Sequence, residues 1–136
     1  HKKRLSEITG REVLKSINEV EPIGPKKMLS ALIVAPCTGN TLAKLANGIT
    51  DTTVCMAAKA HLRSDRPLVL ALASNDALSA NLKNIATMLS RKSVYFVPMV
   101  QDDPQKKPHS LVADFSLLEA TLQGAFEKRQ CRKLFL

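Results

Sequence analysis

Twice along the chain, a short run of apolar residues passes directly into a polar turn and then into residues of helical spacing. The runs are 29–35 (LSALIVA) and 67–73 (PLVLALA), followed by the turns CTGN and SND. Short apolar runs bounded by turn residues are typical of strands buried on both faces of a parallel sheet. We expect the first run, which Pro36 closes, to be central in the sheet. Repetition of strand, turn and helix predicts an α/β fold: a doubly wound parallel sheet in three layers.

The rest of the chain extends this pattern toward the C-terminus. Helical spacing recurs at 42–49, 52–62 and 78–89. Residues 93–100 (SVYFVPMV) are expected to form a third strand, followed by the polar loop QDDPQKKPHS. Residues 111 to about 130 have the apolar spacing of one long amphipathic helix. The last residues, 131–136 (CRKLFL), are expected to be a frayed or partner-bound tail.

The N-terminal part is less regular. Residues 2–8 fit the end of a helix closed by Gly10, residues 11–17 fit a short edge strand, and EPIGPKK fits a loop. The sequence begins at His1, without an initiator Met and inside the helical pattern, so we expect a fragment of a longer chain. Because 136 residues suffice for one hydrophobic core, residues 1–136 are expected to form a single, N-terminally truncated domain.

Composition excludes several classes of protein. The sequence contains no apolar run of membrane-spanning length, and HKKRL does not lead into a signal peptide, which predicts a soluble cytoplasmic protein. Cys37, Cys55 and Cys131 are odd in number and lack CxxC spacing, which disfavours a disulfide framework and a zinc site. The formal charge of +8 suits a small anionic ligand, an acidic partner or nucleic acid. Nucleic acid is the least favoured of these, because there is no Trp, one Tyr and no basic-aromatic repeat.

Two loops are candidates for a binding site, because ligands of open α/β sheets bind beyond the carboxyl ends of the strands. The first covers 36–41 and the second 74–76. In the first, Gly39 permits close backbone approach, and Thr38, Asn40 and Thr41 offer donors beside the free amides of a helix N-terminus, which predicts an anion-binding cradle. The alternative is that Thr38 or Asn40 only caps the helix.

Isolated polar residues elsewhere carry weaker hypotheses. Asp51 is expected to cap the helix that begins near Thr52, and Lys44 and Lys59 to be solvated or paired. His61 and His109 are candidate proton carriers, although His61 has no visible partner. The adjacent Asp102 and Asp103 are expected to shape a turn rather than hold a metal, and Lys106 and Lys107 to meet a dicarboxylate or remain surface charge.

Two segments carry a resemblance to a known family. APCTGNTLAKLANGITD resembles the PASANT segment of the flavin-dependent cysteine decarboxylase family of flavoproteins, and ALASNDALSANLKNI resembles its APAMN segment, with Asn75 at the motif's asparagine. Together with EPIGPKK, MAAKAHLR and YFVPMVQDDPQKKPHSLVAD, these segments are similar to the branch of that family formed by dipicolinate synthase B subunits. The similarity covers most of residues 9–114.

The resemblance implies a Rossmann-like fold whose first strand and glycine-serine phosphate loop precede His1. It implies a part in oxidising dihydrodipicolinate to dipicolinate in the mother cell of a spore-forming bacterium, with a dipicolinate synthase A subunit that binds NADP, and a homo-oligomer. In that family FMN contacts the positions of Thr38, Gly39, Asn40, Thr41 and Asn75.

The sequence also departs from the family pattern. Cys37-Thr38-Gly39 replaces the common Ala-Ser-Ala, and no Met-Trp pair follows Asn75, so decarboxylation of a peptidyl cysteine is disfavoured. No catalytic residue is identified. Two alternatives remain, a stand-alone flavin-dependent oxidoreductase or decarboxylase and a non-catalytic scaffold for the A subunit.

Overall fold

The computed structural model describes Asn18 and residues 29–136. The helix end, edge strand and loop expected within residues 2–25 therefore lie outside the described residues, apart from Asn18. Within the described part of the chain, no helix is long and apolar enough to cross a membrane.

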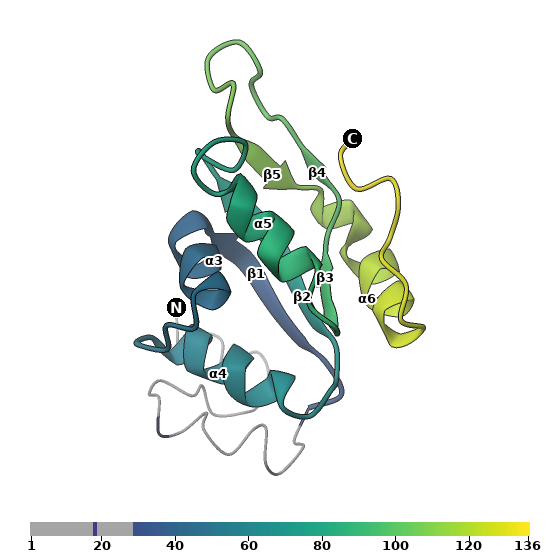
Figure 1. Cartoon of the computed structure of the whole chain (residues 1–136). Helices are drawn as coiled ribbons and strands as arrows, with labels where there is room; N and C mark the ends of the chain where they lie inside the picture. The colour runs from purple at the N-terminus through teal and green to yellow at the C-terminus, as the bar shows by residue number, and fades with distance from the viewer. Residues whose placement is uncertain (1–17, 19–28) are drawn as a thin grey trace, which may run out of the picture.

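A mixed, mostly parallel sheet forms the centre of the molecule (Figure 1). Strand β2 (Leu68–Ser74) pairs in parallel with β1 (Leu32–Thr38) on one side and with β3 (Val94–Phe96) on the other. Beyond β3, the same edge of β2 is taken by the antiparallel β5 (Leu111–Ala113), which in turn pairs with β4 (Met99–Val100).

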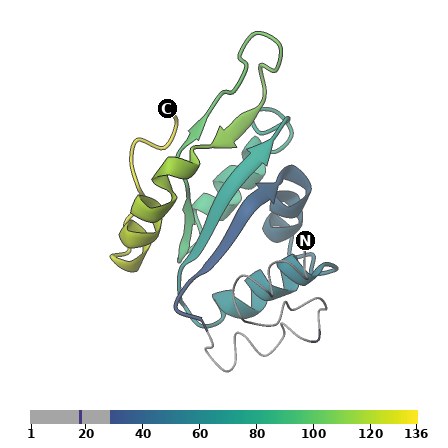
Figure 2. The same cartoon turned by 180° about the vertical axis from the view of Figure 1, so that it is seen from behind.

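Helices cover both faces of this sheet. On one face lie α3 (Gly39–Ala46), α4 (Thr53–Leu62) and α5 (Leu82–Leu89), and on the other lies α6 (Leu118–Phe126), as Figures 1 and 2 show from opposite sides. The three-layer α/β fold predicted from the repeated strand-turn-helix pattern is confirmed, and so is the Rossmann-like fold that the resemblance implies.

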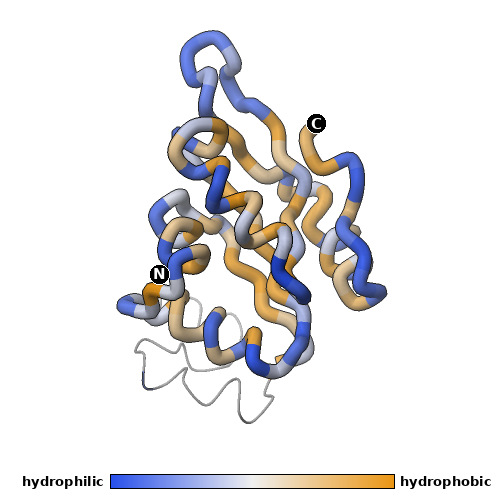
Figure 3. Tube along the Cα trace, in the orientation of Figure 1, coloured by the Kyte–Doolittle hydropathy of each residue, from blue (hydrophilic) through white to orange (hydrophobic). Residues whose placement is uncertain are grey.

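The alternation of side chains along β2 explains the two-sided core. Leu68, Leu70 and Leu72 pack into the cluster that includes α3, α4 and α5, whereas Val69 and Ala71 pack into the cluster on the side of α6. Successive side chains of a strand point to opposite faces, so a continuous apolar run is needed where both faces are covered. Figure 3 shows hydrophobic residues concentrated in the strands, while the loop of residues 101–109 is hydrophilic.

Strand β1 departs from the prediction in two ways. It continues through Pro36 to Thr38, because a bulge between Val34 and Cys37 removes the proline from the regular ladder. Among the described residues it pairs with β2 alone, and Ile33 and Pro36 are exposed. The expectation of a central strand buried on both faces is therefore wrong for the part of the chain that the structure describes.

The C-terminal third also corrects the prediction. The expected strand of residues 93–100 is divided at Val97 and Pro98 into β3 and β4. The expected helix of residues 111–130 begins instead as strand β5, passes through a 3₁₀ turn (Phe115–Leu117) and becomes α6 only at Leu118. Asp114 ends the strand, because its carboxylate accepts a hydrogen bond from the Ser116 amide at 3.0 Å.

The C-terminal tail is not frayed. Phe135 forms a bridge with Met99, whose amide donates to the Leu134 carbonyl at 2.8 Å and whose carbonyl accepts from the Leu136 amide at 2.8 Å. Leu134 also packs against the main core. The free edge of β4 and the partly buried Leu134 thus hold in place the residues that the sequence pattern had assigned to a frayed or partner-bound tail.

Candidate functional site

The turn between β1 and α3 is closed by its own side chains. Thr38 has extended backbone geometry, and its Oγ1 accepts a hydrogen bond from the Thr41 amide at 3.2 Å. The same hydroxyl donates to Thr41 Oγ1 at 3.1 Å. Thr38 is therefore the N-cap of α3, as the capping alternative predicted, while the neighbouring Asn40 remains exposed to solvent.

The turn after β2 holds a carboxylate inside a hydrogen-bond network. Asp76 Oδ1 accepts from Ser74 Oγ at 2.6 Å and from Asn81 Nδ2 at 2.9 Å. Asn84 Nδ2 donates in turn to Asn81 Oδ1 at 2.8 Å. Ser74, Asn81 and Asn84 are buried, so each of these bonds satisfies a polar group that has lost water.

The two turns meet at Gly39. Asn81 Nδ2 lies 3.3 Å from the Gly39 carbonyl oxygen, to which it donates a hydrogen bond. A Cβ atom at residue 39 would lie 2.6 Å from Ser74 Oγ and 2.8 Å from Asn81 Nδ2, closer than side chains pack. The sequence indicated that Gly39 permits close approach, and the structure shows that the approaching group is the Ser74–Asn81 network of the second turn.

An open hollow of about 490 Å³ lies above this junction. We call it the loop hollow, and the residues that line it are Gly39, Asn40, Ala43, Asn47, Asp76, Ala80, Asn81, Lys83 and Asn84. Asn75 is exposed in the second turn, but Asp76 rather than Asn75 lines the hollow. Sequence reasoning placed Asp76 in the second candidate loop without giving it a role, and it missed Asn81 and Asn84, although polar residues that recur three apart at the start of a helix could have indicated them.

The loop hollow is polar and carries charges of both signs. Hydrogen bonds from Ser74 and then from Asn81 lower the pKa of Asp76 from its ordinary value, so the carboxylate is ionised at neutral pH. Lys83 supplies one positive charge in the same lining. The site can therefore accept hydrogen bonds from hydroxyl groups at Asp76 and donate them from Asn40 and from the first amides of α3.

Comparison with known proteins identifies the family to which the chain belongs. The family described as Flavoprotein matches residues 2–117. This chain belongs to the flavoprotein family. Within the family it is 44% identical over 134 residues to the B subunit of dipicolinate synthase of Bacillus subtilis (strain 168), covering 98% of this chain and 67% of the relative. The resemblance seen in the two loop motifs is thereby confirmed.

Solved structures agree with this placement. The crystal structure of the dipicolinate synthase B protein from Bacillus halodurans C superposes with a TM-score of 0.94 at 40% identity, covering 98% of this chain and 69% of that chain. The FMN-dependent cysteine decarboxylase SpaF superposes with a TM-score of 0.65 at 20% identity, over 92% of this chain and 71% of that chain. At that identity, the likeness to SpaF shows the fold alone.

In this flavoprotein-family chain, Cys37 lies directly beneath the first turn and is fully buried. Loss of hydration, followed by the influence of Cys55, raises the pKa of the Cys37 thiol to about 12. Cys37 is therefore protonated at neutral pH, which makes its buried thiol a poor nucleophile. Among the described residues, no group of three His, Cys, Asp or Glu side chains could hold a metal ion.

The isolated polar residues have structural positions. Asp51 does not cap α4, because Thr52 accepts from the Cys55 amide at 3.1 Å and Asp51 instead pairs with Lys44 at 2.9 Å. His61 is buried, with Nε2 at 2.8 Å from the Pro67 carbonyl oxygen, so it joins α4 to the start of β2.

The polar loop of residues 101–109 forms a turn, as expected. Asp103 accepts from the Lys106 amide at its carboxylate and from the Lys107 amide at its carbonyl, at 3.1 and 2.7 Å. A hydrogen bond from Ser110 is the main cause that lowers the pKa of Asp102, and Lys107 lies 3.8 Å away. His109 is exposed on this loop.

Proposed function

We propose that this chain acts as the B component of a dipicolinate synthase and takes part in oxidising dihydrodipicolinate to dipicolinate during sporulation, in the cytoplasm of the mother cell. The support from sequence is the 44% identity to a protein of that name over 98% of the chain. The observation that carries the proposal is the joining of both family motifs at Gly39, where Asn81 reaches across from the second turn. That junction brings the two predicted loops to the edge of one open hollow.

The nicotinamide chemistry is assigned to a partner A subunit that binds NADP. In the loop hollow the ionisable side chains are Asp76 and Lys83. Asp76 is held by two hydrogen bonds in its ionised state, which makes it a poor proton carrier at neutral pH. The chain's contribution is therefore binding and orientation of a polar or anionic group, and the predicted homo-oligomer remains part of the proposal.

We further propose that FMN binds at the loop hollow and the two turns beside it, through Gly39 and Asn40 of the lining and through Thr38, Thr41 and Asn75 of the turns. The donors at the start of α3 and Lys83 suit a phosphate, and the Asp76 carboxylate suits the hydroxyl groups of a ribityl chain. The Thr38 hydroxyl already donates its proton to Thr41 Oγ1, whereas the Thr41 hydroxyl accepts in that bond and keeps its own proton to donate to a phosphate. When bound, a flavin would supply electron acceptance.

The division of labour can be tested by reconstitution. The full chain is mixed with a purified A subunit, NADP and dihydrodipicolinate, and formation of dipicolinate is followed by its ultraviolet absorbance. We expect turnover with both subunits and none with either alone. Asn40→Ala should lower the rate, whereas Lys133→Gln, at an exposed position outside the hollow, should not. Turnover by this chain alone would contradict the proposal.

The family match favours a second candidate, a flavin-dependent oxidoreductase or decarboxylase that works without a partner. It predicts a yellow protein with absorbance near roughly 450 nm that is lost with Asn40→Ala. A third candidate, a scaffold for the A subunit, predicts that complex formation survives Asn40→Ala and Thr41→Ala but weakens as salt rises.

A further inference from the structure

A second hollow, of about 370 Å³, lies on the helical face, away from the two loops. We call it the basic hollow. It lies between the end of α3, the body of α4 and the residue Arg91 that follows α5, and its lining is Leu45, Gly48, Ile49, Thr50, Cys55, Lys59, Leu62, Arg63 and Arg91. None of these residues lines the loop hollow.

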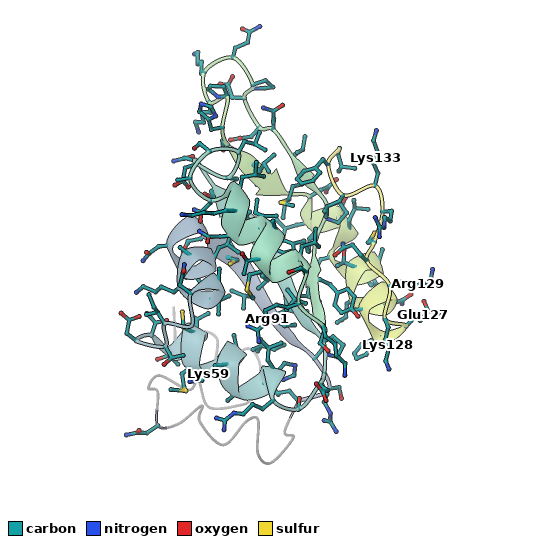
Figure 4. All side chains as sticks on the ribbon, in the orientation of Figure 1. Lys59, Arg91, Glu127, Lys128, Arg129 and Lys133 are labelled. Carbon is teal, nitrogen blue, oxygen red and sulfur yellow. The ribbon has the colours of Figure 1, made fainter. Side chains whose placement is uncertain are left out.

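Three cationic side chains surround the basic hollow. Lys59 and Arg63 belong to α4 and its C-terminal cap, and Arg91 comes from the turn before β3. Figure 4 shows Lys59 and Arg91 on the same side of the molecule, on segments that border the hollow. No Asp or Glu is part of the lining, and none of the three cations pairs with another residue that the structure describes.

Beneath the charges the hollow is apolar. Leu45 and Cys55 are buried at 7% and 0% exposure, and Leu62 packs partly against the main core. Ile49 leaves 45% of its surface exposed beside this floor. An apolar floor with cations at its margin suits a ligand whose flat body is apolar and whose charge lies at its edge, since a cation also interacts favourably with an aromatic face.

Helix geometry explains part of this charge. Cations near a helix C-terminus complement its negative partial charge, which contributes typically about 0.3–1 kcal/mol each. That effect accounts for Lys59, Arg63 and Arg91 near the ends of α4 and α5. It does not account for the concave apolar floor or for the exposed Ile49, both of which favour an occupant.

We propose that the basic hollow is a second binding site, which takes a small aromatic dicarboxylate. The two carboxylates of the ligand pair with the three cations of the hollow, whose lining contains no Asp or Glu to compete for them. The aromatic ring covers Leu62 and Ile49. This inference goes beyond the proposed function, because it does not require the loop hollow, a flavin or a partner subunit. Only the choice of pyridine-2,6-dicarboxylate as the probe rests on the proposed function.

The test is a titration of the full chain with pyridine-2,6-dicarboxylate, in which binding is measured by calorimetry and by changes in amide chemical shifts. We expect saturable binding, with shifts at Ile49 and Leu62, and weaker binding of benzoate and of glutarate, which lack one carboxylate and the ring, respectively. The variant Lys59→Gln/Arg91→Gln should bind at least about tenfold more weakly, because it removes two of the three cations. Lys133→Gln is the matched control, since it removes an exposed charge outside the hollow.

Three results of the titration itself would overturn the proposal: no saturable binding, shifts confined to the loop hollow, or equal loss of affinity in the Lys133→Gln control. A double variant that keeps dicarboxylate affinity but binds the A subunit more weakly would also overturn it, in favour of an acidic protein partner. Unchanged urea unfolding of the double variant excludes misfolding as the cause. Because the titration contains no partner or cofactor, failed turnover in reconstitution leaves its outcome intact.

Discussion

The two hollows differ in what creates them. The loop hollow lies above a junction where backbone and short buried side chains meet, with Asn81 reaching the Gly39 carbonyl at 3.3 Å. The basic hollow is surrounded by long exposed side chains that make no ion pair with other described residues, above an apolar floor. The first is therefore set by close packing and tolerates little change, whereas the second is set by charge and can lose a residue without disturbing the fold.

The largest expected effect concerns the thiol beneath the loop hollow. With its pKa raised from 9.0 to about 12, Cys37 should react with iodoacetamide at pH 8 roughly 10³-fold more slowly in the native chain than in urea. Mass spectrometry of the alkylated peptides measures both rates, and the half-buried Cys131 serves as the internal reference. Rapid labelling of native Cys37 would show that the packing beneath the loop hollow opens readily.

Gly39→Ala tests the close approach between the two turns. The added Cβ would lie 2.6 Å from Ser74 Oγ, so the network must shift, and we expect the free energy of unfolding to fall by about 1–3 kcal/mol. Urea denaturation measures the change. Gly48→Asn is the matched control, because Gly48 has a positive φ of 72° that Asn tolerates and no atom lies within 4 Å of its Cβ position. Equal losses in both variants would count against a tight junction.

The pH dependence of stability that Asp76 causes tests whether hydrogen bonds set the charges of the loop hollow, in contrast to the basic hollow. Its pKa is lower in the folded chain, so its contribution to stability is present above the ordinary aspartate value of 3.8 and is lost as pH falls through the folded pKa. Urea unfolding measured from about pH 6 to about pH 3, which spans the ordinary titration range of aspartate, should show this loss of stability. The Asp76→Asn variant should lose less stability over the same range. Because hydrogen bonds cause the shift, the loss should persist in high salt; disappearance in salt would point to a charge pair instead.

The smallest expected effect is on the stability of the basic hollow. Lys59→Gln and Arg91→Gln should each change the free energy of unfolding by less than about 0.5 kcal/mol, because both side chains are exposed. The same urea assay used for Gly39→Ala makes the comparison direct. A loss above about 1 kcal/mol in either variant would mean that these cations hold the fold together, which would remove the contrast between the two hollows.

Local patterns predicted the parts of the fold that depend on neighbours in sequence. The apolar run of residues 67–73 indicated a strand covered on both faces, and β2 is that strand. The helix of residues 52–62 was also placed correctly, but its cap was not, since Thr52 accepts the Cys55 amide and Asp51 turns to Lys44. Either residue type can cap a helix, and the structure shows that Thr52 does so while Asp51 pairs with Lys44 of α3.

The candidate site was predicted in the same unequal way. The motif around residues 38–41 indicated the turn, the cap and the need for glycine, because each of these has a local signature. The side chains that occupy the space beside Gly39 come from residues 74–84. No local sequence pattern predicts that these two segments lie so close together. The site residues assigned by resemblance stay predictions. The contact between Asp76 of the predicted second loop and Asn81 was found only in the structure.

By itself, the sequence determined the class of fold and the order of strand, turn and helix through α5, because apolar periodicity and turn chemistry act over a few residues. Its motifs also carried the resemblance to the flavoprotein family, which the comparison with known proteins then showed. The tertiary structure alone decided that residues 111–113 form a strand, that the tail pairs with Met99, and that three cations from α4 and its surroundings share one hollow. Those outcomes depend on which strand edge and which helix lie nearby, and such proximity arises only when distant segments pack.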